Sequence, residues 1–235
     1  MNILLIGHGE IGKAVEEAFG INPKAIHDPF QNEHAVKEKY DGMLIAFGYS
    51  DTFIKDVISY IKEFSPEFVI IFSTTDVGTC SKIQEISGIA VSHCPVEGKH
   101  PDLLRSFVNT PNWIGNPSFG AYELFTSFGY EVKRLEKSEY TELLKLLSTT
   151  KYGVNIEFAR YAKECCDKVG LDYEEVKNWD MMVNELYRNV LNLPQYTRYI
   201  LDPPEGPKGG HCVTPNAIVL DKQFPNPIID IVAEK

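Results

Sequence analysis

Three glycines near the start of the sequence, Gly7, Gly9 and Gly12, have the spacing G-x-G-x-x-G. The first glycine permits a tight turn, the second lets the backbone approach a pyrophosphate, and the third allows a helix to pack closely on a strand. The pattern follows an apolar run at residues 3–6 and opens a helix-like segment. Because the unpaired N–H groups and the dipole at a helix start favour phosphate, the loop predicts a dinucleotide-binding site.

A carboxylate that fits the same site is Asp28, at the end of the second expected strand. It stands about 20 residues after the first glycine, where a carboxylate can accept hydrogen bonds from the adenine-ribose hydroxyls. A carboxylate there would repel a 2′-phosphate, so the sequence favours NAD over NADP as the cofactor. The alternative is a turn residue in the Asp28-Pro29 dipeptide.

Alternating apolar strands and amphipathic helices must position these groups. The expected strands are residues 3–6, 25–27, 43–47, 68–72 and 89–92. Continuous apolar strands separated by helices indicate a parallel sheet covered on both faces. We therefore expect an α/β protein, in which a mostly parallel Rossmann-type sheet at residues 1–138 binds NAD and a small all-helical domain with one long helix follows.

The helical pattern of the second half begins with one long helix at residues 139–169, which ends before Gly170. A second helix starts after Asp172, and we assign residues 139–200 to a helical domain. A helix of about 30 residues is ~45 Å long, so we expect a second subunit to cover part of it in a homodimer. Residues 201–235 form a Pro- and Gly-rich C-terminal segment, either a shaped loop or a flexible tail.

Composition narrows the class of protein. The net charge of −10 argues against binding to nucleic acid or to an anionic membrane, which both recruit basic surface. No apolar run reaches the roughly 20 residues that span a bilayer, and we expect the first residues to form a strand and not a signal peptide. Five irregularly spaced cysteines predict neither a disulfide framework nor a metal site, which favours reduced thiols and a cytoplasmic location.

Four further segments have the order and approximate spacing of family motifs. They are STTDVGT at 73–79, CPVEGK at 94–99, LKLLST at 144–149 and GGHC at 209–212. They resemble, in turn, the S-T-x-x-x-G-T loop near the nicotinamide, the substrate-side loop, the K-x-x-x-N helix segment and the G-G-x-C thiol motif of the nucleotide-sugar (UDP-glucose/GDP-mannose) dehydrogenases. That family shares a superfamily with 3-hydroxyisobutyrate and 6-phosphogluconate dehydrogenases, and the resemblance covers most of the chain.

The resemblance implies catalytic roles for two residues. Lys145 matches the family's lysine, which would hydrogen-bond the alcohol and stabilise the oxyanion that forms as hydride departs. Cys212 matches the nucleophile, whose thiolate would capture an aldehyde, with Lys208 and His211 as local groups that would lower its pKa. The alternatives are that Lys145 is an exposed lysine on a helix and that Cys212 is a small buried packing residue. We interpret the other four cysteines as packing residues.

Three departures from the family pattern limit these roles. Thr149 replaces the asparagine that follows the catalytic lysine, with a hydroxyl of shorter reach. His93 lies near the family's acidic position, as a general base or a strand-end histidine, which leaves Glu97 as the nearby carboxylate. Nucleotide-sugar dehydrogenases also carry a further Rossmann-like domain, and we expect this chain to be a short form without it.

The sequence therefore predicts an NAD-dependent dehydrogenase that oxidises a primary alcohol or aldehyde of a small polar, sugar-like or nucleotide-sugar-like substrate. One alternative is a two-electron hydroxy-acid or alcohol dehydrogenase that uses Lys145 without thiol chemistry, and the other is a non-catalytic dinucleotide-binding module. The expected catalytic residues are Cys212, Lys145 and Thr149. The expected cofactor contacts are Gly7, Gly9, Glu10, Ile11, Gly12, Asp28, Ser73 and Thr74. The expected substrate contacts are His93, Glu97, Lys99, Gly209, Gly210 and His211.

Overall fold

The computed structural model describes residues 1–98, 102–206 and 212–233 of the chain. It divides into two compact units, Met1–Lys145 and Leu146–Lys235. The predicted substrate contacts Lys99, Gly209, Gly210 and His211, together with Lys208, lie outside the described residues.

The first unit is built on one mostly parallel sheet. Within the described residues its seven strands have the order β2-β1-β3-β4-β5-β6-β7. Their bounds are β1 Ile3–Ile6, β2 Ile26–His27, β3 Gly42–Ile45, β4 Phe68–Ile71, β5 Ala90–His93, β6 Asn112–Gly115 and β7 Val132–Leu135. All neighbours are parallel except β5 and β6, so β1 to β5 end at one common edge.

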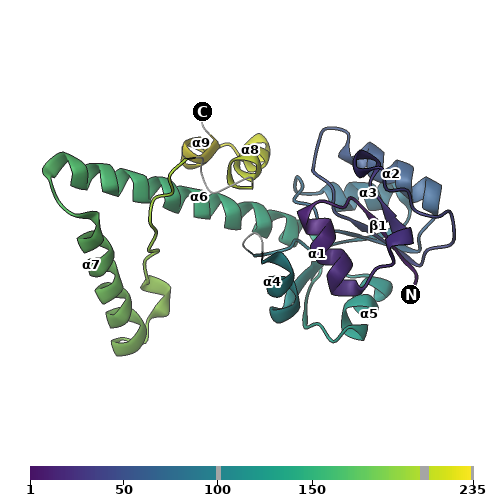
Figure 1. Cartoon of the computed structure of the whole chain (residues 1–235), viewed down its shortest axis with the longest axis horizontal. Coiled ribbons are helices and arrows are strands. Elements are labelled where there is room, and N and C mark those ends of the chain that lie inside the picture. The colour runs from purple at the N-terminus through teal and green to yellow at the C-terminus, as the bar shows by residue number, and fades with distance from the viewer. Residues whose placement is uncertain (99–101, 207–211, 234–235) are drawn as a thin grey trace. The chain divides into compact units, whose positions relative to one another are not determined.

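Helices cover both faces of this sheet. Their bounds are α1 Glu10–Phe19, α2 Phe53–Phe64, α3 Thr79–Ser87, α4 Leu103–Asn109 and α5 Phe119–Ser127. Figure 1 shows α1, α4 and α5 over one face and α2 and α3 over the other. On the first face Phe19 meets the rings of Phe107 and Phe125 edge-on, with centroids 5.6 and 5.1 Å apart. Edge-to-face packing of this kind adds to the stabilisation from burial.

The predicted fold class and the five predicted strands are confirmed, with strand ends within one or two residues. The last two strands, β6 and β7, were not predicted. The side chains of Trp113, Lys133 and Arg134 are exposed, so neither strand has the continuous apolar pattern of β1, β3 and β4. β7 lies at the sheet edge, and an edge strand that is not buried on both faces needs no such pattern.

The second unit is helical. Its elements are the end of α6 (Ser138–Val169), α7 (Tyr173–Glu185), the short turns η3 (Leu186–Val190) and η4 (Pro194–Tyr196), α8 (Val213–Gln223) and α9 (Pro227–Ala233). The predicted long helix is confirmed, and so is the cap of the next helix, where Asp172 accepts a hydrogen bond from the Glu174 amide at 3.0 Å. A Cβ on Gly153 of α6 would lie 2.4 Å from Val232 and 2.6 Å from Val213, so this glycine lets α8 and α9 pack closely on α6.

Helix α8 was not predicted, because residues 201–235 were assigned to a Pro- and Gly-rich segment, and Pro215 lies within the helix. The proline occupies the first turn, where its missing N–H leaves no bond unmade. Among the described residues, no helix combines the length and apolar character that crossing a bilayer requires.

Candidate functional site

The glycine loop joins β1 to α1 at the carboxyl edge of the parallel strands. Gly7 has φ +90°, and a Cβ there would lie 2.8 Å from the Phe47 amide nitrogen. A Cβ on Gly12 would lie 2.2 Å from the Gly7 carbonyl oxygen, so any side chain would push α1 off the strand. Both glycines are therefore required by the backbone itself, as the pattern predicts.

The loop also has the features that a phosphate needs. Gly9 is the N-cap of α1, no side chain caps the helix there, and a Cβ at this position would meet nothing within 4 Å. The first helical residues, Glu10 and Ile11, are exposed and half-buried respectively. Because the first N–H groups of a helix lack intrahelical partners, this open helix start fits the pyrophosphate of a dinucleotide.

Asp28 lies directly after β2 and is held by the glycine loop. Its Oδ2 accepts hydrogen bonds from the His8 amide at 2.8 Å and from Gln31 Nε2 at 3.1 Å, and its Oδ1 accepts one from the Phe30 amide at 3.0 Å. Burial alone would raise the pKa of Asp28, but these hydrogen bonds hold it below the ordinary value. The carboxylate is therefore ionised and fixed in orientation, and its predicted bond to a ribose remains a prediction.

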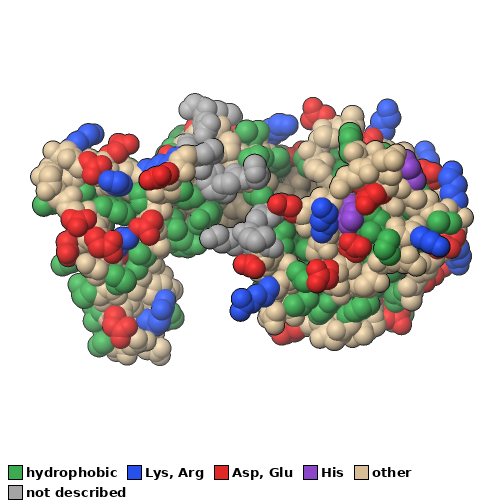
Figure 2. Space-filling view, in the orientation of Figure 1, with side chains coloured by type: hydrophobic (Ala, Val, Ile, Leu, Met, Phe, Trp, Pro, Cys, Tyr) green, Lys and Arg blue, Asp and Glu red, His purple; other side chains and the backbone are tan. Residues whose placement is uncertain are grey.

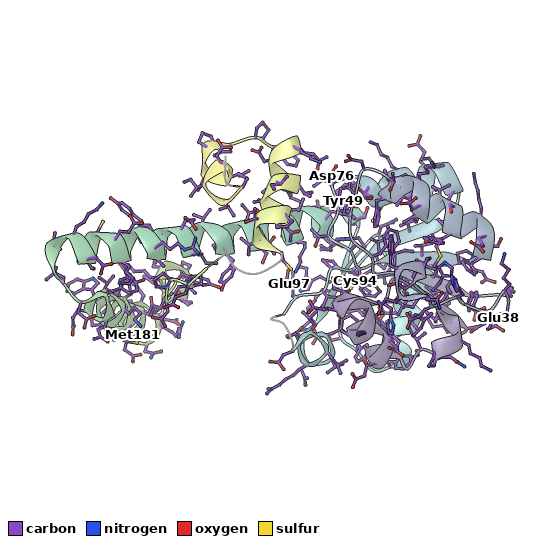
Figure 3. All side chains as sticks on the ribbon, turned by 45° about the horizontal axis from the view of Figure 1, so that its top comes forward. Glu38, Tyr49, Asp76, Cys94, Glu97 and Met181 are labelled. Carbon is purple, nitrogen blue, oxygen red and sulfur yellow. The ribbon has the colours of Figure 1, made fainter. Side chains whose placement is uncertain are left out.

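The loops after β3 and β4 are joined through Ser73. Its hydroxyl donates to the Phe47 carbonyl at 2.6 Å, and Thr74 beside it is half-buried. The buried Thr75 Oγ1 has no hydrogen-bond partner among the described residues. Further along, Tyr49 and Asp76 lie next to each other (Figure 3), and burial raises the pKa of Tyr49 to about 12. An unpaired buried hydroxyl costs free energy, so Thr75 is suited to meet a bound group at this edge.

One face of α6 is hydrogen-bonded to the segment that follows β4. Glu142 is fully buried, and its two oxygens accept hydrogen bonds from the amides of Gly78 at 2.6 Å and Cys80 at 2.9 Å. Burial raises the pKa of Glu142. A carboxylate at these amides stabilises the start of α3. The bonds also fix the rotation of α6, which decides where Lys145, one turn later, is held.

Lys145 is held at the loop after β5. Its Nζ donates to the Val96 carbonyl at 2.8 Å and lies 3.4 Å from Glu97 Oε1. The lysine side chain is 12% exposed and the Glu97 side chain 59% exposed. Figure 3 labels Glu97 beyond the buried Cys94, where the chain leaves β5. A positioned ammonium group beside an exposed carboxylate is suited to hold a hydroxyl or an oxyanion.

His93 has both ring nitrogens in internal hydrogen bonds. Its Nε2 lies 3.1 Å from the Ser73 carbonyl, which can only accept, so Nε2 carries the proton and Nδ1 accepts from Thr141 Oγ1 at 2.8 Å. The ring is fully buried, and burial lowers the pKa of His93 to about 4. This geometry supports the interpretation of His93 as a strand-end histidine that joins β5 to α6, and gives no support to a general base.

The second unit brings Thr149 and the first turn of α8 together. Thr149 Oγ1 donates to the Leu146 carbonyl at 3.2 Å and accepts from Asn216 Nδ2 at 3.1 Å. Cys212 is the N-cap of α8, is exposed, and accepts at its carbonyl a hydrogen bond from the Asn216 amide. Lys145 belongs to the first unit and Cys212 to the second, and each is described within its own unit.

Three residues with clear structural parts in the site were not predicted. They are His8, Glu142 and Asn216. His8 is a titratable residue inside the glycine motif, and Glu142 stands one helical turn before Lys145. Asn216 stands one turn after Cys212, so spacing along a helix was a usable signal for these two.

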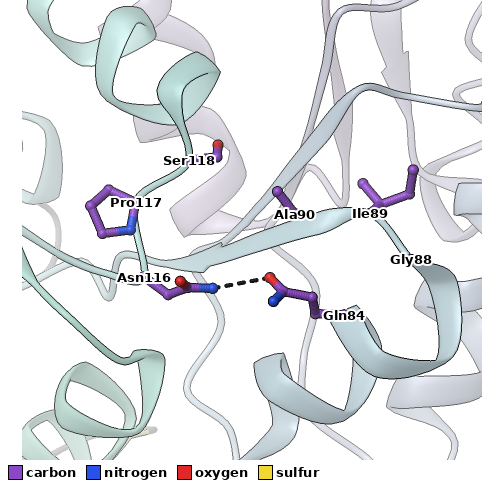
Figure 4. Close-up of a pocket in the computed structure, with 7 residues that line it drawn as sticks. All are labelled: Gln84, Gly88, Ile89, Ala90, Asn116, Pro117 and Ser118. Carbon is purple, nitrogen blue, oxygen red and sulfur yellow. Dashed lines mark hydrogen bonds between the residues drawn. The ribbon is translucent and has the colours of Figure 1, made fainter.

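A separate hollow of about 350 Å³ lies at the opposite edge of the sheet, at the amino end of β5 (Figure 4). Gln84 Oε1 there accepts hydrogen bonds from the Val91 amide and from Asn116 Nδ2, both at 3.0 Å. Gln84 and Asn116, which line the hollow, are thus hydrogen-bonded to each other, and Gln84 also to the sheet. Because β1 to β5 are parallel, the hollow lies away from the glycine loop and Lys145, and it forms no part of the candidate site.

No protein-family model matches the chain. In sequence it is 26% identical over 210 residues to a UDP-N-acetyl-D-mannosamine dehydrogenase of Methanococcus vannielii, a match that covers 81% of this chain and 46% of that protein. The chain thus spans about half the length of this curated relative. Its resemblance to nucleotide-sugar dehydrogenases is confirmed.

Solved structures share the fold. The UDP-D-ManNAc dehydrogenase of Pyrococcus horikoshii has a TM-score of 0.77 at 18% identity, covering 100% of this chain and 68% of that one. The 3-hydroxyisobutyrate dehydrogenase of Mycobacterium tuberculosis has a TM-score of 0.67 at 12% identity, covering 99% of this chain and 91% of that one.

Proposed function

Starting from the resemblance to nucleotide-sugar dehydrogenases, we propose that the chain is an NAD-dependent dehydrogenase. It oxidises a primary alcohol or aldehyde of a small polar, sugar-like or nucleotide-sugar-like substrate. The observation that carries this proposal is the placement of Lys145, because its bonds to the loop after β5 hold its ammonium group at the sheet edge where the glycine loop opens. The names of the relatives make UDP-N-acetyl-D-mannosamine the first substrate to test.

The cofactor preference rests on charge. Asp28 is joined by the carboxylates of Glu16 and Glu33, which both lie within 2.9 Å of the His8 ring. An additional 2′-phosphate would meet this acidic group, so NAD is favoured over NADP. Bound NAD would supply the acceptor for hydride from the substrate carbon.

The first oxidation needs a group that hydrogen-bonds the substrate hydroxyl and helps to remove its proton. Lys145 donates a hydrogen bond to the substrate oxygen and stabilises the negative charge that develops there as the C–H bond breaks. Glu97 beside it accepts a proton or holds the ammonium in place. The products would be an aldehyde, NADH and one proton, and the proton leaves through this pair to solvent.

A second oxidation needs the aldehyde to be held as an adduct. The Cys212 thiolate attacks the aldehyde carbon, forming a C–S bond, and the carbonyl oxygen takes up a proton to give a thiohemiacetal. Loss of hydride to a second NAD, bound in place of the NADH formed first, and loss of that proton leave a thioester. Water then breaks the C–S bond to release the acid and the thiol. Asn216 and Thr149, bonded to each other, hold the turn of α8 that carries Cys212.

The test is the stoichiometry of NADH formation. We expect two NADH per substrate consumed, measured by absorbance at 340 nm against acid product. Cys212→Ala should lower kcat by at least about a thousandfold, as expected when a covalent nucleophile is removed. Cys165→Ala is the matched control, because this exposed cysteine is remote in sequence from every motif. If NAD binds but no sugar or nucleotide sugar is oxidised, the proposal is wrong.

A second candidate function keeps Lys145 and omits the thiol. The bonds of Lys145 to Val96 and Glu97 lie within the first unit and do not involve Cys212. A two-electron alcohol or hydroxy-acid dehydrogenase would therefore not require the thiol of Cys212. One NADH per substrate and full activity in Cys212→Ala would establish this candidate in place of the first.

We also propose that the protein is a homodimer in the cytoplasm. Cys80, Cys94, Cys165 and Cys166 form no disulfide in the part of the chain that the structure describes, as expected for a reducing compartment. Hydrophobic side chains gather over α7 (Figure 2), where Trp179 is 66% exposed and Met181 and Met182 are about half exposed. Exposed apolar surface of this kind marks an interaction site, and a second copy of the chain is the simplest partner.

A further inference from the structure

His8, between the first two glycines of the loop, is bonded through every polar group it has. Its amide donates to Asp28 Oδ2 at 2.8 Å, and its carbonyl accepts from Gln31 Nε2 at 2.7 Å. Its ring Nδ1 lies 2.8 Å from Glu33 Oε2, and its Nε2 lies 2.7 Å from Glu16 Oε2. The ring is 13% exposed, so these contacts are largely shielded from water.

Both ring nitrogens face carboxylate oxygens, which can only accept. With both carboxylates ionised, each nitrogen can make its hydrogen bond only when it carries a proton, so the contacts fit an imidazolium. Burial alone would lower the pKa of His8, but the hydrogen bonds to Glu16 and Glu33 hold it above the ordinary value. Charge-assisted bonds of this kind are roughly twice as strong as neutral ones.

The two carboxylates come from different parts of the predicted cofactor site. Glu16 lies on α1, and Glu33 forms a two-bond backbone bridge with Asp28, each amide donating to the other residue's carbonyl at 3.0 Å. The charged groups that face His8 are thus Glu16 from α1, and Glu33 and Asp28 from the segment after β2. One protonated ring joins the phosphate loop, its helix and the ribose side of the site.

We propose that the imidazolium of His8 is a positioning residue for the dinucleotide, holding the glycine loop against the Asp28 turn and offsetting part of the acidic charge that an anionic ligand meets. This inference rests on the proposed NAD site and goes beyond the glycine and aspartate contacts of the motif. Loss of the ring proton removes one of the two N–H bonds and leaves three carboxylates uncompensated. The loop then loses its tie to one carboxylate, and the site repels the phosphates.

The direction of the pH dependence follows. The bonds to Glu16 and Glu33 are fully present below the ordinary pKa of His8 and are lost as pH rises through its higher value in the folded protein. Affinity for NADH therefore falls as pH rises, although neither Asp28 nor the glycines titrate in that range.

The experiment is NADH binding by the full chain, followed by NADH fluorescence from pH 6 to pH 9. For the wild type we expect the Kd to rise roughly tenfold across this range, the size expected from one charge-assisted interaction. His8→Gln should bind NADH more weakly at pH 6 and show a flat profile. His34→Gln is the matched control, an exposed histidine of the same segment that should keep the wild-type profile.

Glu33→Gln supplies a second test that leaves His8 in place. It removes one carboxylate partner, so the midpoint of the pH profile should shift to lower pH. If His8→Gln keeps the wild-type pH profile, or if Glu33→Gln leaves the midpoint unchanged, the inference is overturned. A wild type that binds neither NADH nor NADPH at any pH would overturn the proposed function and this inference with it, whereas binding without pH dependence overturns this inference alone.

Discussion

The two units of the chain differ in how completely their surfaces are covered. In the first unit α1 to α5 bury their apolar faces on one sheet, and Val15, Val57 and Ile83 are fully buried. In the second unit α7 buries only Val183 of its thirteen residues within the described part of the chain, and Trp179 remains 66% exposed. The first unit thus has its own core, whereas the second has apolar surface that its own elements leave to solvent.

The residues of the candidate site are likewise divided between the two units. The glycine loop, Asp28 and Lys145 are fixed by bonds inside the first unit, while Cys212 and Thr149 belong to the second. Helix α6 contributes to both units, because its first turns are bonded to the sheet loops and its later turns pack against α8 and α9. In the proposed mechanism, cofactor binding and the first oxidation therefore depend on the first unit, and the thiol step depends on the second.

Among variants of the first unit, the largest effect that would test this division is expected from Lys145→Met. Removal of a positioned donor to a developing oxyanion should lower kcat/KM by about a hundredfold to a thousandfold. NADH binding should be unchanged, since the glycine loop and Asp28 are untouched. Steady-state kinetics and NADH fluorescence measure the two quantities separately.

Lys151→Met is the matched control for that variant, an exposed lysine further along the same helix. Equal losses in the two variants would show that the effect comes from α6 in general. If Lys145→Met keeps full activity, the first unit does not supply the catalytic group and the comparison fails.

A smaller effect is a loss of folding stability at acid pH, and it arises in the first unit. His93 has a pKa of about 4 in the folded protein against an ordinary value of 6.5. The unfolded chain therefore takes up a proton below pH 6.5 that the folded chain refuses until about pH 4. Stability is lost over this window as pH falls, by about 3 kcal/mol in all.

Urea unfolding at pH 7, 6 and 5 measures this loss, with His93→Gln as the comparison. Glutamine can still donate to the Ser73 carbonyl and accept from Thr141, so the variant should fold, with lower stability at pH 7 and a shallower dependence on pH. Other titrating groups are common to both proteins and cancel in the difference. Identical pH slopes would mean that His93 is not neutral and buried in solution.

The sequence was most informative where a local pattern has one physical cause. The glycine spacing, the strands β1 to β5 and the long helix all follow from patterns within a few residues, and each is present. The strands β6 and β7 and helix α8 were missed, because their residues are set by neighbours far along the chain. Trp113 is exposed on β6, and Pro215 is tolerated only because it falls in the first turn of α8.

Within the site, residue types were predictable and partners were not. Lys145 was singled out by a motif, but its bond to the Val96 carbonyl joins residues 49 positions apart. The link between His8 and Glu33 spans 25 positions, and the bond between Thr149 and Asn216 spans 67. His93 is an example. Its ring is neutral because it is buried and makes two hydrogen bonds, and no local sequence pattern reveals either feature.

The smallest expected effect concerns the exposed surface of the second unit, and it tests whether that surface is covered in solution. Trp179→Ser removes a large exposed indole from α7, so folding of the single chain should change little, by less than about 0.5 kcal/mol. If a second copy covers this face, the dimer dissociation constant should rise by about tenfold or more, because buried aromatic residues dominate interface energies. Sedimentation equilibrium across a range of concentrations measures this dissociation constant.

Ile86→Ser is the matched control, since Ile86 is 62% exposed on α3 of the first unit and the substitution should leave the association unchanged. A wild type that stays monomeric at every concentration would show that α7 is not a self-association surface, and the exposed face would then need a different partner.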